Sequence, residues 1–244
     1  MLQVLPYNHL ALVNNNQLTS NNPISFGYKS HLKEEAQHCA YCASEIATGK
    51  NLNKLSEKIL TSKGDELSNL FTKLVKNFSL QSEMSTSHTT KERIHYVKNL
   101  KSMSEKMPED SGRNLIAKFT KSHNHLRKGL YDEYFLKQIY RKPETVARYL
   151  VNPFLTSVDH IIPKSKGGEN VNENYMVSCV SCNRSRNNED FKSWSSKHTV
   201  IFKNIVNYLK EIISNNKPHK RDNYVNSIIK LISENTGKTL HLLG

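Results

Sequence analysis

The chain has 244 residues, 36% of them hydrophobic, and its 35 Lys and Arg against 22 Asp and Glu give a formal net charge of +13. No stretch approaches the roughly 18 uninterrupted apolar residues of a membrane-spanning helix, which excludes a helical integral membrane protein. The charge favours a polyanionic partner through counterion release, although a soluble protein with solvated lysines has the same composition. The length allows one sizeable hydrophobic core or two modest ones.

The N-terminal segment, residues 1–42, ends in the first pair of cysteines. Residues 1–36 are rich in Asn and weakly patterned, which predicts an irregular or partly helical lead-in. The first residues lack the basic n-region and the cleavage site of a signal peptide. We therefore expect a cytoplasmic protein, with a secreted effector as the alternative.

Residues 43–155 are predicted to form a helical insertion. Helices are expected from Gly64 through a run of apolar residues at helical spacing to Phe78, around 94–100, over roughly 113–142 and over 144–150. Pro143 closes or kinks the third of these. The Ser- and Thr-rich stretch 79–91 is aperiodic and is interpreted as a loop. Residues 43–158 hold 20 basic and 12 acidic residues, so much of the positive charge lies here.

Residues 156–195 have a different character. TSVDHII, from residue 156, is rich in β-formers and predicts a strand, the turn-rich residues 164–174 predict a loop, and YMVSC at 175–179 predicts a second strand before a helix. Residues 196–244 carry two amphipathic stripes, which predict a C-terminal helical hairpin around 215–220.

The four cysteines form two C-x-x-C pairs, Cys39/Cys42 and Cys179/Cys182. In a non-secreted chain this spacing is typical of a metal site, because thiolates two residues apart let one tight turn offer two ligands. Four thiolates fill the tetrahedral shell of zinc and leave no open position, so the predicted site is structural. The alternatives are four unrelated thiols, or a site in which His38 replaces one cysteine.

Asp159-His160, then Asn174, then Cys179-x-x-Cys182-Asn183 closely resemble the signature of the His-Asn-His (HNH) endonucleases, D-H-I-x-P … N … C-x-x-C-N. The resemblance covers residues 158–187 and the distant first knuckle, which zinc-containing HNH nucleases also carry. It implies an α+β fold: a small zinc-stabilised ββα-metal core at 156–195, to which the helical insertion and the C-terminal hairpin are added.

The resemblance also implies roles for individual residues. His160 is the general base that activates water, Asp159 and Asn183 hold a catalytic Mg²⁺ or Mn²⁺, and Asn174 braces the loop and orients the base. These groups suit phosphodiester hydrolysis, because a neutral imidazole accepts a proton near physiological pH and hard oxygen ligands favour these ions. Four flanking basic residues are candidate phosphate contacts, with solvated side chains as the alternative: Lys164, Lys166, Arg184 and Arg186.

Two features depart from a simple pattern. Neighbouring residues on a strand face opposite sides, yet Asp159 and His160 must serve one phosphate, so we expect the strand to end, twist or bulge there. In compact HNH nucleases the first knuckle lies a few tens of residues before the Asp-His pair, whereas residues 43–158 intervene here. We interpret them as an arm that either extends the DNA footprint or docks a partner protein.

Each site residue has a structural alternative: Asp159 as a turn acid, His160 as a core histidine, Asn174 as a turn former and Asn183 as a helix cap. For the whole protein, the alternatives to a DNA endonuclease are a non-catalytic zinc-stabilised nucleic-acid-binding module and an RNA-directed nuclease. Double-stranded DNA is the expected substrate; one such site cuts one strand, and a dimer could cut both. Because no repeated sequence-reading module is visible, an effector nuclease of phage defence or a toxin is favoured.

Overall fold

The computed structural model describes residues 36–85, 88–123, 142–215 and 218–242. This part of the chain is mainly helical and contains one two-stranded antiparallel sheet, which confirms the predicted α+β class. None of its helices is long and apolar enough to cross a membrane. The helices and strands are, in order, α2 (Gly49–Thr61), α3 (Gly64–Met84), α4 (His88–Lys106), α5 (Gly112–His123), α7 (Pro143–Val151), β1 (Thr156–His160), β2 (Tyr175–Cys179), α8 (Val180–Arg186), α9 (Phe191–Ser196), α10 (Ile201–Asn215) and α11 (Pro218–Thr236).

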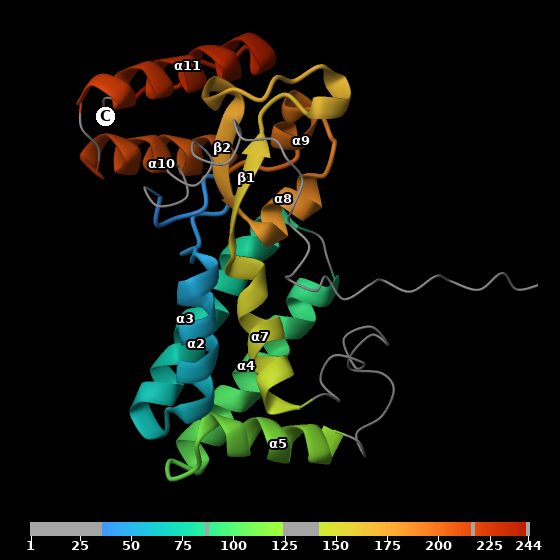
Figure 1. The fold of residues 1–244 in the computed structure, drawn as a ribbon. Helices are drawn as coiled ribbons and strands as arrows, with labels where there is room; N and C mark the ends of the chain where they lie inside the picture. The colour runs from blue at the N-terminus through green and yellow to red at the C-terminus, as the bar shows by residue number, and fades with distance from the viewer. Residues whose placement is uncertain (1–35, 86–87, 124–141, 216–217, 243–244) are drawn as a thin grey trace, which may run out of the picture.

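The buried apolar side chains form two clusters. The elements that carry them form two groups, one above the other in Figure 1. The helical core lies among α2, α3, α4, α5 and α7, which together we call the helical unit, and its residues come from 52–154. The sheet core surrounds β2, α9, α10 and α11, which together with β1 and α8 we call the sheet unit, and it also includes Ala36, residues 39–42 and Met84. The described part of the chain thus has two modest hydrophobic cores rather than one sizeable core.

The prediction of a loop at 79–91 is wrong, because most of this stretch is helical. α3 continues to Met84 and α4 begins at His88, so only a short connection interrupts the helices. The hydroxyls of Ser79 and Ser82 donate to carbonyls of the preceding turn of α3, at 2.8 and 2.7 Å. These bonds satisfy polar side chains within a helix, and the burial of Met84 in the sheet core supplies stability that the local sequence does not reveal.

Other helical predictions agree with the structure where it can be compared. The helix expected over 113–142 is present as α5, and its continuation beyond residue 123 lies outside the described residues. Pro143 occupies the first turn of α7, where its missing N–H costs no hydrogen bond.

The helical unit leaves and rejoins the rest of the chain at adjacent points. Ala47 forms a parallel bridge with Leu155: its N–H donates to Phe154 at 3.0 Å, and its carbonyl accepts from Thr156 at 2.9 Å. Because these two ends meet, the first cysteine pair lies beside the sheet although more than a hundred residues separate it from β1 in sequence.

The sheet is short and regular. Asp159 pairs with Met176 and His160 with Tyr175, so the register continues to the end of β1 without an extra residue. The predicted C-terminal hairpin is formed by α10 and α11. Its contact with the sheet includes the hydroxyl of Tyr224, which lies 2.8 Å from the Tyr208 hydroxyl and donates to the Tyr175 carbonyl at 2.9 Å.

Candidate functional site

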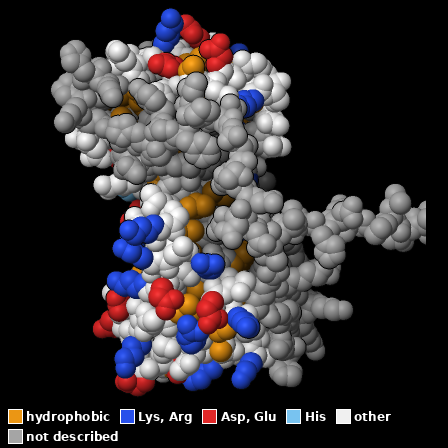
Figure 2. Space-filling model, viewed as in Figure 1, with side chains coloured by type: hydrophobic (Ala, Val, Ile, Leu, Met, Phe, Trp, Pro, Cys, Tyr) orange, Lys and Arg blue, Asp and Glu red, His pale blue; other side chains and the backbone are white. Residues whose placement is uncertain are grey.

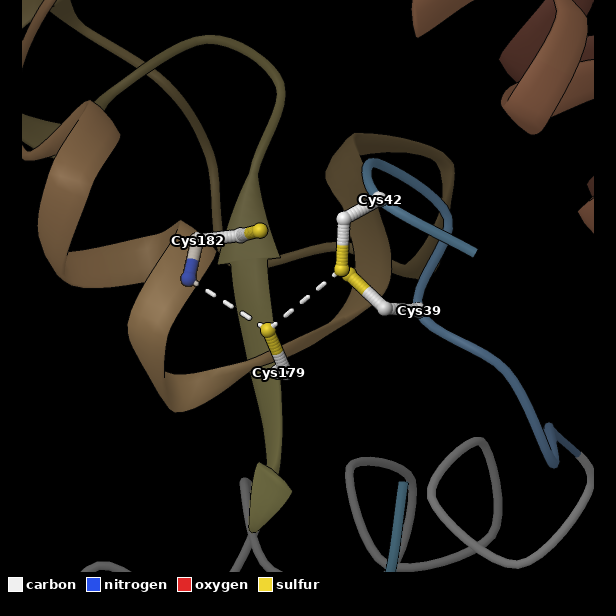
Figure 3. Close-up of side chains that lie close together, drawn as sticks. All are labelled: Cys39, Cys42, Cys179 and Cys182. Carbon is white, nitrogen blue, oxygen red and sulfur yellow. Dashed lines mark hydrogen bonds between the residues drawn. The ribbon is translucent and has the colours of Figure 1, made fainter. Parts of the chain in front are cut away.

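The four cysteines meet in one buried cluster, drawn in Figure 3. Their sulfur atoms all lie within 4.8 Å of one another, and Cys42 Sγ is 3.9 Å from Cys179 Sγ. Four thiolates at about 2.3 Å from a tetrahedral zinc would be about 3.8 Å apart. The donor set and its spacing therefore fit a structural zinc ion. His38 lies outside the cluster, with Nδ1 2.8 Å from Glu211 of α10.

The backbone of each cysteine pair donates a hydrogen bond to one of its own sulfur atoms. The N–H groups of Tyr41 and Cys182 each donate to a sulfur two or three residues earlier, at 3.4 Å. Burial raises the pKa of the Cys179 thiol well above its usual value, so a thiolate there requires a compensating cation. Gln81 of α3 donates to the same sulfur at 3.4 Å. A side chain of the helical insertion thus belongs to the surroundings of the metal site.

Asp159 lies near the end of β1 with 7% of its surface exposed. Its Oδ2 accepts from the Tyr41 hydroxyl at 2.8 Å and from Arg186 Nη1 at 2.6 Å. Burial and then the charge of Asp159 raise the pKa of Tyr41 well above its ordinary value, so the phenol remains a donor. Both contacts use one carboxylate oxygen, which leaves Oδ1 as the atom that could bind a metal.

His160 is the last residue of β1 and is half-buried, facing away from the Asp159 contacts. Its Nε2 lies 3.0 Å from Asn170 Oδ1, which also accepts from the Tyr175 hydroxyl at 3.2 Å. An oxygen acceptor beside Nε2 favours the tautomer that carries its proton there. β1 ends at His160. An end of the strand at this point is one of the three geometries expected from the sequence, beside a twist and a bulge.

Asn174 makes three hydrogen bonds across the loop between the strands. Its Oδ1 accepts from the N–H of Ile162 at 2.8 Å, and its Nδ2 donates to the carbonyls of Ile162 and Glu169 at 3.0 Å each. The side chain is 4% exposed. These contacts close the loop directly after His160.

Asn183 projects from α8 back onto β1. Its Nδ2 donates to Ser157 Oγ at 2.6 Å and lies 3.4 Å from the carbonyl of Val158. The helix is short, and its N-cap is Cys179 itself, whose sulfur accepts from Cys182. The metal-binding turn thus fixes the helix that carries Asn183 next to the residue that precedes Asp159.

The four basic residues singled out in the sequence have different environments. Lys164, Lys166 and Arg184 are exposed, as phosphate contacts require. Arg186 is 1% exposed, and besides Asp159 it donates to the carbonyls of His160 and Ile161. The expectation of a phosphate contact is therefore wrong for Arg186: its guanidinium is occupied inside the protein, where it holds the end of β1.

Sequence reasoning missed Tyr41, Gln81 and the internal role of Arg186. All three side chains contact residues that lie from 25 to 118 positions away in the sequence. The only local signal was the place of Tyr41 between two metal-binding cysteines.

Comparison with known proteins adds a family assignment. Residues 152–189 match the family model described as HNH endonuclease. The chain carries an HNH domain. The match spans β1, the loop, β2 and α8, and it includes the Asp-His pair, Asn174, the second cysteine pair and Asn183. No curated protein and no solved structure matches the chain.

HNH domains are typically metal-dependent nuclease domains, so the assignment indicates nuclease activity and a nucleic-acid substrate. The matched segment and the cysteine cluster occupy the same part of the fold. The helical unit lies largely outside the match, which begins at residue 152.

Proposed function

We propose that this protein is an endonuclease that hydrolyses DNA phosphodiester bonds, with His160 as the general base and one divalent cation held by Asp159 and Asn183. The observation that carries the proposal is the packing of α8 against β1. It places the Asn183 amide against Ser157 and Val158, directly before the Asp-His pair. The Asn183 side chain thus lies against the strand that carries Asp159 and His160, within the segment that matches the HNH endonuclease family.

The residues present fit a hard cation. Asp159 offers the carboxylate oxygen that Tyr41 and Arg186 do not use, and Asn183 offers the amide oxygen opposite its bonded Nδ2. Oxygen donors of this kind suit Mg²⁺ or Mn²⁺. When bound, the cation would supply positive charge against the phosphate and the departing oxygen.

His160 provides the proton acceptor. Asn170 fixes one imidazole nitrogen and Asn174 closes the following loop, so the ring is held at the strand end while it remains half-buried and reachable. A histidine in this state can take a proton from water as the water attacks phosphorus. Arg186 holds the backbone carbonyl of the same residue and so limits movement of the base.

The direct test is cleavage of supercoiled plasmid in Mg²⁺ by the purified protein. We expect His160→Ala to retain fold, zinc and DNA binding but to cut at least about 100-fold more slowly, because the proton acceptor is lost. Asp159→Ala should also lose activity, with partial recovery at higher Mg²⁺ or in Mn²⁺. Metal should not rescue His160→Ala, because its missing function is proton transfer.

The matched control is His95→Ala, which removes an exposed histidine of α4 and should leave the rate unchanged. Near-normal cleavage by His160→Ala would refute the assignment of the base. Binding without cleavage by the unaltered protein would identify a non-catalytic module. Labelled RNA offered beside DNA determines the substrate class. We further propose an effector role in phage defence or as a toxin, which rests on the absence of a repeated sequence-reading module from the sequence.

A further inference from the structure

A polar cleft lies between the helical unit and the HNH domain, and one of its lining residues follows Asn183 in α8. It has a volume of about 420 Å³ and lies between the first turn of α4 and the helix α8. Arg93 enters it from the helical unit and Arg184, the residue after Asn183, from the HNH domain. Serine, threonine and asparagine side chains supply most of the remaining wall, among them Thr89 and Ser181.

The charge of this cleft is uncompensated. Among the described residues that line it, two are arginines and none is acidic. Each of three other cavities in the described part of the chain includes at least one glutamate: Glu45 beside the knuckle, Glu169 beside α11, and Glu57 between α2 and α7. Hydroxyl donors and the N-terminal end of a long helix add to the preference of this cleft for an anion.

The two guanidinium groups have no acidic partner among the residues that the structure describes. Within the described residues, neither side chain makes a hydrogen bond or an ion pair, and the buried Nε of Arg93 is unsatisfied. Arg93 stacks over the Tyr149 ring, with its central carbon 4.5 Å from the ring centre. Stacking on the face holds the planar group in place while its edge keeps donors for a phosphate.

Five other basic residues of the helical unit form ion pairs with acidic residues. Figure 2 shows Lys and Arg mixed with Asp and Glu over the face of this unit that is in view. Ion pairs that involve basic residues of the helical unit include Lys58–Glu66, Lys73–Glu45, Lys101–Glu105, Arg113–Glu144 and Lys118–Asp110. The two arginines of the cleft, which have no acidic partner among the described residues, are therefore better placed to bind a polyanion than these five paired cations.

We propose that this cleft binds the phosphodiester backbone of the nucleic acid next to the bond that is cut. The proposal rests on the proposed nuclease function and gives the helical unit a part in it. A strand held at Asn183 continues along α8 to Arg184 and reaches Arg93 across the cleft. The helical unit thereby lengthens the contact with the substrate without contributing to the chemistry.

The test measures binding of a labelled DNA duplex over a range of salt concentrations in Mg²⁺, in a His160→Ala background that prevents cleavage. Arg93→Gln with Arg184→Gln should lower the magnitude of the slope of log affinity against log salt by about 2, because each lost phosphate contact is worth about 0.9. The matched control is Arg113→Gln with Arg148→Gln, which removes the same charge elsewhere on the helical unit. Its slope should change by much less.

Equal slope changes in the two double variants would overturn the proposal, because charge alone would then explain binding. Arg184→Gln, at an exposed position, gives the answer if Arg93→Gln fails to fold: it should lower the slope by about 1. Cleavage by the protein with His160 intact is measured separately on plasmid. Cleavage with an unaffected slope refutes the cleft alone, whereas the absence of any nucleic-acid binding refutes both the cleft and the nuclease.

Discussion

Tyr41 connects the zinc knuckle with the carboxylate of Asp159. The ring is fully buried between the two cysteines of the knuckle and packs edge-on against Trp194, with centroids 4.8 Å apart. Its hydroxyl reaches Asp159 directly. A residue that the metal site immobilises therefore orients a candidate ligand of the second metal, which is the role of outer-shell partners in other metal centres.

Replacing Tyr41 with Phe removes only this hydroxyl. We expect the variant to fold and retain zinc, with a half-saturating Mg²⁺ concentration for cleavage raised about 10-fold, because Asp159 is less well oriented. Titration of the cleavage rate with Mg²⁺, together with zinc analysis, checks this. The control is Tyr208→Phe, which removes another buried hydroxyl of the same core that has hydrogen bonds of its own. A metal dependence like that of the control would contradict the role of Tyr41.

At the scale of single residues, the sequence predicts features that depend on the spacing of nearby residues. The cysteine pairs and the loop-spanning contacts of Asn174 follow from short-range pattern and from the resemblance to HNH nucleases. Arg186 was misjudged because nothing in its neighbours indicates that it is buried against Asp159. A buried ion pair forms only through tertiary contact, and its loss usually costs several kcal/mol because one charge is left unpaired.

At the scale of elements, the loop from Ile161 to Asn174 determines where His160 lies. Besides the Asn174 brace, it depends on a close approach at Gly168: a Cβ there would lie 1.8 Å from the carbonyl oxygen of Ile162 and 2.9 Å from Asn174 Nδ2. The first of these atoms is backbone and cannot move without shifting the segment that follows His160. Glycine is therefore required for the loop to close.

Gly168→Ala should lower the free energy of unfolding by about 1–3 kcal/mol, the usual cost of forced overpacking. It should also reduce cleavage more than DNA binding, because the base is displaced while the basic surface is kept. Thermal unfolding and single-turnover cleavage measure the two effects. Gly49→Ala is the control, since a Cβ at Gly49 meets nothing within 4 Å. Unchanged cleavage by Gly168→Ala would show that the loop does not position His160.

The two strands and the helix α3 show which elements a local sequence pattern can predict and which it cannot. The second strand has the predicted bounds, and β1 begins at the predicted residue but ends at His160, two residues early; β-forming residues are bounded there by turn-rich sequence. The end of α3 was missed because Ser79 and Ser82 suggest a loop, whereas contacts of Gln81 and Met84 with the sheet unit extend the helix. Those contacts join segments about a hundred residues apart, so no window of sequence contains them.

At the scale of the whole molecule, the two cores depend on the zinc site to different degrees. The four cysteines belong to the sheet core, and they join the segment before the helical unit to β2 and α8. The helical core is built from residues 52–154 without any of them. Gln81 and Met84 of α3 and the bridge between Ala47 and Leu155 connect the two.

Loss of zinc should therefore unfold the sheet unit before the helical unit. A structural zinc contributes on the order of 10 kcal/mol in small domains, more than the stability of most domains of this size. We expect about one zinc per chain in the purified protein, and none in Cys179→Ser, which should lose cleavage. Its helical circular dichroism should fall only in part, since α2, α3, α4, α5 and α7 pack on their own core. Ser178→Ala, a change at the adjacent buried residue, is the control. Complete loss of the helical signal in Cys179→Ser would mean that the helical unit cannot fold without the contacts that α3 makes with the metal site.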